Sequence, residues 1–441
     1  MKRFVLLLLT ITTFRGFAED SITLERVRTL ALANSRSLAA HNLAIRSSVL
    51  DERSELYSNL PSLSVGAGTG TNIRSLQNGL KIQDAVDGNI NLSISQKIFQ
   101  GGKSLVYRRI ASINTEIARN AALAEYFSVL DQADSAYYGV LEAAANLLAS
   151  ESSLETAALA LSIAEIKAQG GMINRGDYLR ALSEKETAEN NRNRARRDLS
   201  LSKTKLSALT GLAELPALLD VDFGSYELLF AALYSIEDEK IDALSETLWN
   251  KAAAANPSLL NAGLSGRNAE YNYSLAKRDF SPVISASFST GFNFSSNGTE
   301  FSAGRLSLSG SIPLDVWVTA NNAEKKKTAR DSAALDYLDS AASLRTELKT
   351  ALLDIISQAG TVLSSRRSRE YAEQHFEYTM ELFRLSGNSV SDLSDASSLL
   401  NTSRSQLIQA EYALLSGLSR LRSLCGILDE EELIKLLEEV P

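Results

Sequence analysis

Apolar residues recur at helical spacing through two very long stretches of the chain, residues 103–168 and 322–385. In the first stretch Ile110, Ile113 and Ile117 are separated by three or four positions, which predicts one continuous helix with a narrow apolar seam. None of the 6 prolines interrupts either stretch, as the steric exclusion of proline from helix interiors requires. Helices of about 65 residues would be roughly 100 Å long. An ordinary compact domain does not accommodate such a length.

Two shorter helical stretches, residues 33–59 and 177–210, together approach the length of one long helix. Placed end to end they would cover roughly 90 Å. We therefore expect two short helices in line to flank one long helix in each half of the chain. Residues 183–198 are polar almost all round although they lie inside a predicted helix. This pattern fits a solvated coiled-coil face or a helix wall with water on both sides, and periodicity does not separate the two.

Strict alternation of apolar and small polar residues predicts two pairs of β-strands. The second pair, residues 282–294 and 302–312, has the turn signal Asn297-Gly298 between its strands. The first pair runs around Leu63–Ala67 and Ile90–Ile98, and a polar loop over roughly residues 72–87 is expected to join its strands. One face of the second pair, which we expect to contact lipid, contains Ile284, Phe288, Phe292, Leu306 and Leu308.

Strands of this length with one apolar and one small polar face are typical of a transmembrane barrel, whose tilted strands need about 9–11 residues. A soluble sandwich hairpin is the alternative, but the long polar helices offer it no core. Four strands do not close a barrel, since known barrels start at about eight. Open strand edges in lipid cost several kcal/mol for each unpaired backbone group. Several chains must therefore share one barrel.

The predicted layout occurs twice along the chain. ANSRSL at 33–38 matches AANPSL at 254–259, and GDYLRA at 176–181 aligns with SDLSDA at 391–396. Such self-similarity indicates a duplicated architecture. We expect the last segment to form a short amphipathic helix or a loosely held tail. The predicted divisions are a signal peptide (1–18), a first repeat (19–211), a linker (212–250), a second repeat (251–426) and an acidic tail (427–441).

The N-terminus has a basic start and an apolar stretch too short to span a bilayer, which predicts a secretory signal. Its removal changes the net charge from −8 to −11, because three basic residues leave. An acidic exported protein is a poor candidate for binding nucleic acid. Cys425 has no partner for an internal disulfide, and neither His41 nor His375 has a second metal ligand nearby in the sequence. We therefore expect no catalysis, metal or cofactor.

Several phrases of the sequence resemble the TolC-type outer-membrane efflux proteins, and the resemblance covers essentially the whole mature chain. Individually each phrase is weak, but their duplicated order makes the match strong. The phrases are LSISQKIFQGGK (92–103), LSLSGSIPLDV (306–316), the helix endings LTG (209–211) and LCG (424–426), GDYLRA (176–181) and SDLSDA (391–396).

The resemblance implies a mainly α fold with a small β part, assembled as a homotrimer in the outer membrane. Three chains would contribute four strands each to a twelve-stranded barrel, and their long helical hairpins would form a periplasmic α-barrel. Residues 212–250 and 427–441 would form a belt around it. Such proteins are passive exit ducts of tripartite efflux or type I secretion systems. Their partners are a periplasmic adaptor (a membrane fusion protein) and an inner-membrane pump of RND, ABC or MFS type. The alternative, a soluble periplasmic coiled-coil scaffold or adaptor, leaves the four strands unexplained.

By the same resemblance, Asp392 and Asp395, with Asp177 in the first repeat, would ring an aperture at the inner end of the tunnel. Positions i and i+3 share one helix face. Three-fold symmetry would gather like charges, favour cations and raise the pKa values of these carboxyl groups. Acids in a first helical turn also offset the helix dipole, with Ser389 or Ser391 as the cap. Both interpretations remain open.

Gly171, Arg384 and Gly387 resemble the hairpin-tip positions that dock the adaptor. Gly387 precedes its acid by five residues whereas Gly171 precedes Asp177 by six, so we expect the second turn to differ from the first. A solvated helix charge is the other explanation of Arg384. Trp317 fits either an interfacial aromatic belt or packing beneath the barrel.

Overall fold

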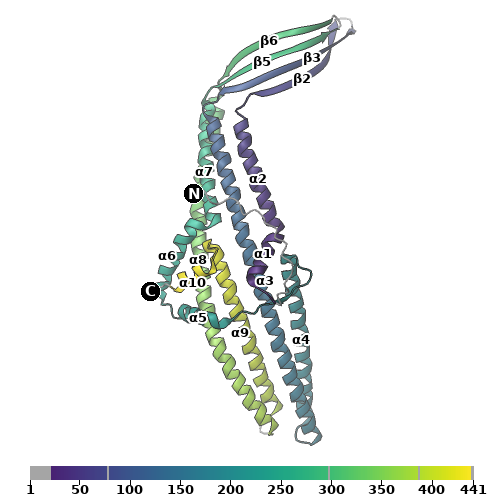
Figure 1. Ribbon diagram of the computed structural model, residues 1–441, viewed down its shortest axis with the longest axis vertical. Helices are drawn as coiled ribbons and strands as arrows, with labels where there is room; N and C mark the ends of the chain where they lie inside the picture. The colour runs from purple at the N-terminus through teal and green to yellow at the C-terminus, as the bar shows by residue number, and fades with distance from the viewer. Residues whose placement is uncertain (1–20, 77–78, 296–297, 386–387, 439–441) are drawn as a thin grey trace.

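The molecule is long and narrow, with a β-sheet at one end and two helical hairpin tips at the other (Figure 1). The computed structural model describes residues 21–76, 79–295, 298–385 and 388–438. The predicted signal peptide, residues 1–18, lies outside these ranges. Two helices run most of the length, α3 (Lys103–Gln169, 67 residues) and α8 (Val316–Arg384, 69 residues). They confirm the two predicted long helices.

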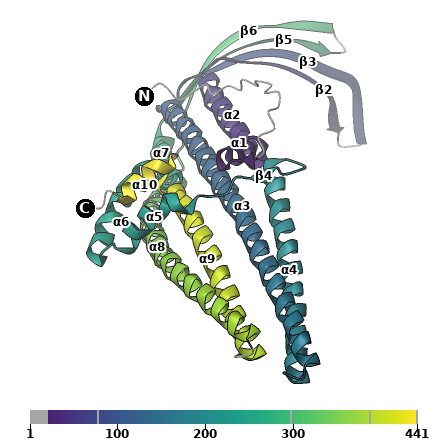
Figure 2. The same cartoon turned by 60° about the horizontal axis from the view of Figure 1, so that its bottom comes forward.

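Shorter helices lie in line along each long one, as predicted. Beside α3, α2 packs on the half nearer the sheet and α4 on the other half, and α7 and α9 flank α8 in the same way (Figures 1 and 2). Within the chain, α4 buries only four residues, so it is a thin wall element with most of its surface exposed. The bounds are α2 (Arg36–Tyr57), α4 (Arg175–Thr210), α7 (Pro257–Lys277) and α9 (Val390–Cys425).

Two helix boundaries differ from the prediction. The expected helix over residues 33–59 is divided at Ser35, which ends α1 (Leu24–Asn34) and accepts a hydrogen bond from the Leu38 N–H as the N-cap of α2. The second long helix begins at Val316 rather than residue 322, because its β-branched first turn carries little helical pattern.

The four-stranded antiparallel sheet has the order β2-β3-β5-β6. The central strands β3 and β5 come from different halves of the chain, so the sheet joins the halves and leaves β2 and β6 as its edges. A short 3-10 turn, η2 (Arg278–Phe280), precedes β5. The strands are β2 (Ser62–Leu76), β3 (Gly79–Phe99), β5 (Val283–Ser295) and β6 (Gly298–Ser311).

The expected polar loop over residues 72–87 is wrong. Backbone pairing between β2 and β3 continues out to Leu76 opposite Gly79, past one irregularity between Thr71 and Ile73. Polar composition does not exclude a strand there, because ladder hydrogen bonds form irrespective of side-chain polarity. Residues 77–78, between the paired Leu76 and Gly79, lie outside the described ranges.

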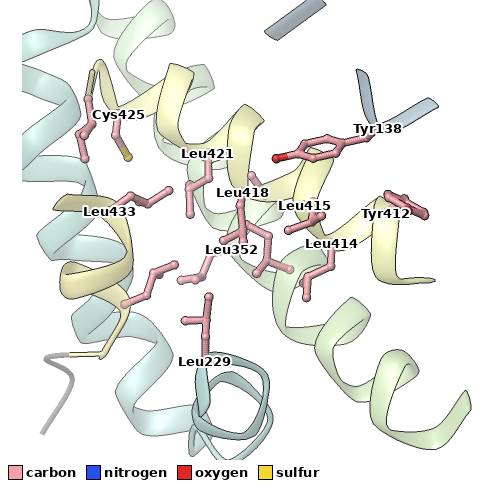
Figure 3. Packing of buried hydrophobic residues seen from close by; sticks show 14 of the residues in the cluster. Tyr138, Leu229, Leu352, Tyr412, Leu414, Leu415, Leu418, Leu421, Cys425 and Leu433 are labelled. Carbon is pink, nitrogen blue, oxygen red and sulfur yellow. The ribbon is translucent and has the colours of Figure 1, made fainter. Parts of the chain in front are cut away.

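The main apolar core lies at mid-length, where the smaller helices cover the long helices α3 and α8. There α5, α6 and α10 pack around α8 and α9, and Leu229, Leu352, Leu418 and Leu433 meet in one buried cluster (Figure 3). The acidic C-terminal segment is therefore a docked helix, with residues 439–441 outside the described ranges. The remaining elements are β1 (Ser21–Ile22), β4 (Ala217–Leu218), η1 (Phe223–Tyr226), α5 (Glu227–Tyr234), α6 (Asp238–Ala255) and α10 (Glu430–Glu438).

Candidate functional site

One face of the sheet is apolar across all four strands. Strand register carries this face from β2 to β6, since Leu63 pairs with Ile94, Ile94 with Phe288 and Phe288 with Leu306. Leu306 is 79% exposed within the chain. A continuous exposed apolar surface of this kind marks contact with lipid or protein. The structure thus places together Ile284, Phe288, Phe292, Leu306 and Leu308, whose contact with lipid stays a prediction.

The opposite face of the sheet is lined by hydroxyl groups. Paired serines on neighbouring strands hydrogen-bond through their Oγ atoms, at 2.7 Å for Ser62–Ser95 and Ser64–Ser93. A third such pair, Ser287–Ser307, spans 2.8 Å between β5 and β6. A sheet with one apolar and one hydroxyl-lined face fits a barrel wall with lipid outside and water inside.

Two glycines turn the chain from β3 into α3. Gly101 and Gly102 have φ of 62° and 72°, which favours glycine, and a Cβ on Gly101 would lie 2.4 Å from the Cβ of Ser281. The ion pair of Lys103 Nζ with Asp279 Oδ1, at 2.6 Å, ties this junction to the second half. The junction therefore fixes the direction in which α3 leaves the sheet.

The second half has no glycine pair where its sheet meets α8. Trp317 stands in the first turn of α8 and is 75% exposed. Its side chain does not pack beneath the sheet of its own chain. Both interpretations of Trp317 stay predictions, because the barrel is formed with neighbouring chains.

Asp392 and Asp177 both occupy helix-capping positions at the tips. Ser389 donates from its backbone N–H (2.9 Å) and its hydroxyl (2.8 Å) to Asp392 Oδ2, and its Oγ accepts from the Asp392 N–H. Asn174 similarly accepts from the N–H of Asp177 and donates to its Oδ2. The hydrogen bonds from Ser389 lower the pKa of Asp392. The expected rise in pKa depends on neighbouring chains, because it comes from repulsion between copies.

Asp395 is less constrained than Asp392. Its side chain is 77% exposed and lies 3.8 Å from Arg180 Nη2, the residue that replaces the second acid in the first repeat. Exposed pairs of this kind contribute about 0–1 kcal/mol. Arg180 also contacts Glu184 Oε1 at 3.2 Å, so its charge is shared. Both acids on this turn of α9 are exposed, and Asp395 is the one whose carboxylate accepts no capping hydrogen bond.

The first hairpin tip is a tight glycine turn at the end of α3. Gly171 has φ of 69°, and the Met172 N–H donates to the Lys167 carbonyl at 2.8 Å, which completes a Schellman motif. In the second tip Arg384 lies 3.9 Å from Glu381 on its own helix and is otherwise exposed. Gly387, the third predicted docking residue, lies outside the described ranges.

The two tips of one chain are held against each other. Lys167 is buried, donates from Nζ to the carbonyl oxygen of Phe383, and lies 4.1 Å from the centroid of the Phe383 ring. Burial lowers the pKa of Lys167. The sequence gives no sign of this contact, because the lysine and the phenylalanine are on different helices and neither belongs to a motif. A small core surrounds them, with Ala164, Ala181, Met380, Val390 and Leu393.

The family model described as "Outer membrane efflux protein" matches residues 27–212 and 248–427. The chain belongs to this family. No curated protein sequence matches it significantly. Solved structures share its fold at low identity. They include CusC, which is 15% identical in sequence; the match covers 94% of this chain and 96% of CusC, with a TM-score of 0.77. CmeC from Campylobacter jejuni is 16% identical over 96% of this chain and 89% of CmeC, with a TM-score of 0.74. VceC from Vibrio cholerae is 15% identical over 91% of this chain and 96% of VceC, with a TM-score of 0.73.

Membership in the outer membrane efflux family confirms the predicted class of function and the predicted location. The chain is an outer-membrane exit duct with a periplasmic tunnel, of the kind found in tripartite efflux systems. Family members are trimeric channels rather than enzymes. The soluble scaffold or adaptor is therefore set aside as the alternative.

Proposed function

We propose that three copies of this chain close one twelve-stranded barrel and one helical tunnel, which together carry solutes out of the periplasm. The sheet supports this proposal most strongly, because its faces differ as a barrel wall requires and the outer edges of β2 and β6 pair with no strand among the described residues. Lipid does not tolerate unpaired strand edges. Residues 1–18 would be cleaved on export, leaving the repeats 19–211 and 251–426 joined by residues 212–250.

The exposed apolar surface of α3 supports the same assembly. Among the described helices, α3 is the one long and apolar enough by composition to cross a membrane, yet only 11% of its most apolar window is buried in the chain. At roughly 100 Å it is over three times longer than a hydrocarbon core of about 30 Å. We assign its apolar surface to contacts between neighbouring chains in the tunnel.

Within this assembly we propose that Asp395 supplies the main fixed charge of the periplasmic aperture, with Asp392 and Asp177 close by as capping acids. Arg180 partly offsets Asp395. In planar bilayers at low salt, Asp395→Asn should lower the cation-to-anion permeability ratio roughly two-fold or more, because screening is then weak. Arg180→Gln should raise the same ratio, because it removes the positive charge that partly offsets the Asp395 carboxylate.

Asp392→Asn serves as the matched control on the same helical turn. It replaces the charged acceptor of the capping hydrogen bonds by a neutral amide oxygen, so we expect a less stable tip and a smaller change in selectivity than Asp395→Asn gives. Unchanged reversal potentials for both Asp395→Asn and Arg180→Gln in open channels would remove Asp395 from the aperture.

We propose that the hairpin tips, with Gly171, Arg384 and Gly387, dock a periplasmic adaptor, which connects the duct to an inner-membrane pump of RND, ABC or MFS type. Ile166, Met172 and Leu385 are exposed apolar residues at these tips, as a protein-docking surface requires. Arg384→Glu should reduce site-specific cross-linking to the adaptor several-fold. Arg369→Glu, four helical turns away on α8, should leave it unchanged; equal yields for both variants would exclude Arg384 from docking.

A further inference from the structure

An arginine of β6 stands on the hydroxyl-lined face of the sheet. Arg305 on β6 pairs with Ser289 on β5, beside the Ser287–Ser307 pair. Its neighbour Leu306 lies on the apolar face. A Cβ on Gly304 would lie 2.8 Å from the Phe288 ring, so that position also faces the apolar side. Both neighbours independently place Arg305 on the hydroxyl-lined face.

Arg305 has no counter-charge close to it. Among the described residues it makes no ion pair or side-chain hydrogen bond, and its side chain is exposed. Glu300, the nearest acid along β6 on that face, pairs with Asn293 and lies five residues away, roughly 15 Å along the strand. Lys97, opposite Ser285 toward the helical end, carries the same sign as Arg305. The serine hydroxyls around Arg305 are neutral and leave its charge uncompensated.

We infer that Arg305 forms, from three protomers, a band of positive charge inside the barrel that favours the passage of anionic solutes, those with carboxylate, phosphate or sulfonate groups. This inference rests on the proposed trimer. Twelve strands about 4.8 Å apart and tilted by about 40° enclose a cylinder of roughly 12 Å radius. Arginine side chains project inward from that wall, so the three charges act within about one Debye length of the axis at 0.1 M salt.

The barrel band and the periplasmic aperture would then act in series with opposite preferences. Asp395 at the tips favours cations, whereas Arg305 favours anions on the outer side of the same duct. A neutral solute, or one that carries both a positive and a negative charge, would be repelled by neither the Arg305 band nor the Asp395 aperture. The band is therefore a second determinant of specificity, remote from the helical tips.

The test measures reversal potentials of reconstituted channels in a KCl gradient, with Asp395→Asn as the parent so that the aperture contributes little. Arg305→Gln should lower the chloride-to-potassium permeability ratio about three-fold at roughly 0.01–0.1 M salt, and the difference should vanish near 1 M because of screening. Arg305→Lys retains the charge and should keep most of the parent ratio.

Equal ratios for Arg305→Gln and its parent at low salt, in trimeric channels that open normally, would overturn the band and leave the duct intact. A loss that Arg305→Lys shows to the same extent would also overturn it, because charge would then not be the cause. Absence of any trimer or conductance in the wild-type protein would instead overturn the proposed assembly, and the band with it.

Discussion

Asp134→Ala is expected to destabilise the chain by about 3–5 kcal/mol, because it takes from two buried guanidinium groups the one fully buried carboxylate that pairs with both. Asp134 is fully buried and accepts from Arg28 Nε at 2.6 Å and from Arg422 Nη2 at 2.8 Å. Glu430 at the start of α10 completes the cluster, 3.2 Å from Arg28. Burial opposes the charged form of Arg28, but the hydrogen bonds and charge of Asp134 outweigh it and raise the pKa of Arg28.

The cluster joins α1 and α3 of the first half to α9 and α10 of the second. Losing Asp134 should therefore also loosen α10, which keeps the buried contacts of Leu433 and Leu437 and the ion pair of Glu432 with Lys251. Urea unfolding of the protein in mild detergent, followed by the circular dichroism of its helices, measures the loss in free energy of unfolding. Limited proteolysis near residue 430 measures how far α10 has detached from the core.

Asp131→Asn is the matched control, one turn away on the same helix. Burial, and then the charge of Asp134, raise the pKa of Asp131. A carboxyl group whose pKa is raised on folding contributes stability that is fully present below its unfolded pKa and is lost as the pH rises through its folded pKa. Near neutral pH its removal should be neutral or slightly stabilising. Equal losses for Asp131→Asn and Asp134→Ala would show that the cluster has no special role.

Leu306→Arg should abolish insertion of the barrel, whereas Ser307→Arg, one residue further on, should be tolerated. Arginine on the lipid face costs about 2–4 kcal/mol near the bilayer midplane. A trimer would contain three such arginines, so the total free-energy cost of insertion approaches the free energy of unfolding of an ordinary domain. Residue 307 lies on the hydroxyl-lined face, where a charge stays in water.

Outer-membrane fractionation and the yield of trimer measure this difference between the faces. We expect wild-type yield for Ser307→Arg and little or none for Leu306→Arg. The reverse order would mean that the two faces of the sheet have been assigned the wrong way round, and the positions of Arg305 and of the apolar band with them.

Local patterns of the sequence predicted the regular elements well. The long helices follow from three-four spacing without proline, and the strands follow from alternation, because both periodicities record which face is buried. Boundaries were less accurate at Ser35 and at the β2–β3 hairpin. At the first a single cap divides a helix, and at the second backbone pairing extends a strand through polar residues.

Contacts between distant parts of the chain could not be predicted. The cluster of Arg28, Asp134 and Arg422 spans 106 and 288 positions of sequence, and nothing in any one segment marks its members. The aperture acids were identified only through a resemblance. Whether they face the axis depends on neighbouring chains, which one chain does not contain. By contrast, the position of Arg305 could have been predicted from alternation, since it directly precedes the apolar Leu306.

The central claim, that three copies close one barrel, is tested most directly by cross-linking the two free edges of the sheet. Ser64→Cys on β2 is combined in turn with Ser307→Cys and Ser309→Cys on β6, and a short thiol cross-linker is added to membranes. Burial raises the pKa of the native Cys425 thiol to about 12, so that thiol stays unreactive. If three chains close the barrel, a denaturing gel should show a ladder of monomer, dimer and trimer that stops at the trimer. Monomer alone for every pair, or a ladder that continues past three chains, would contradict it.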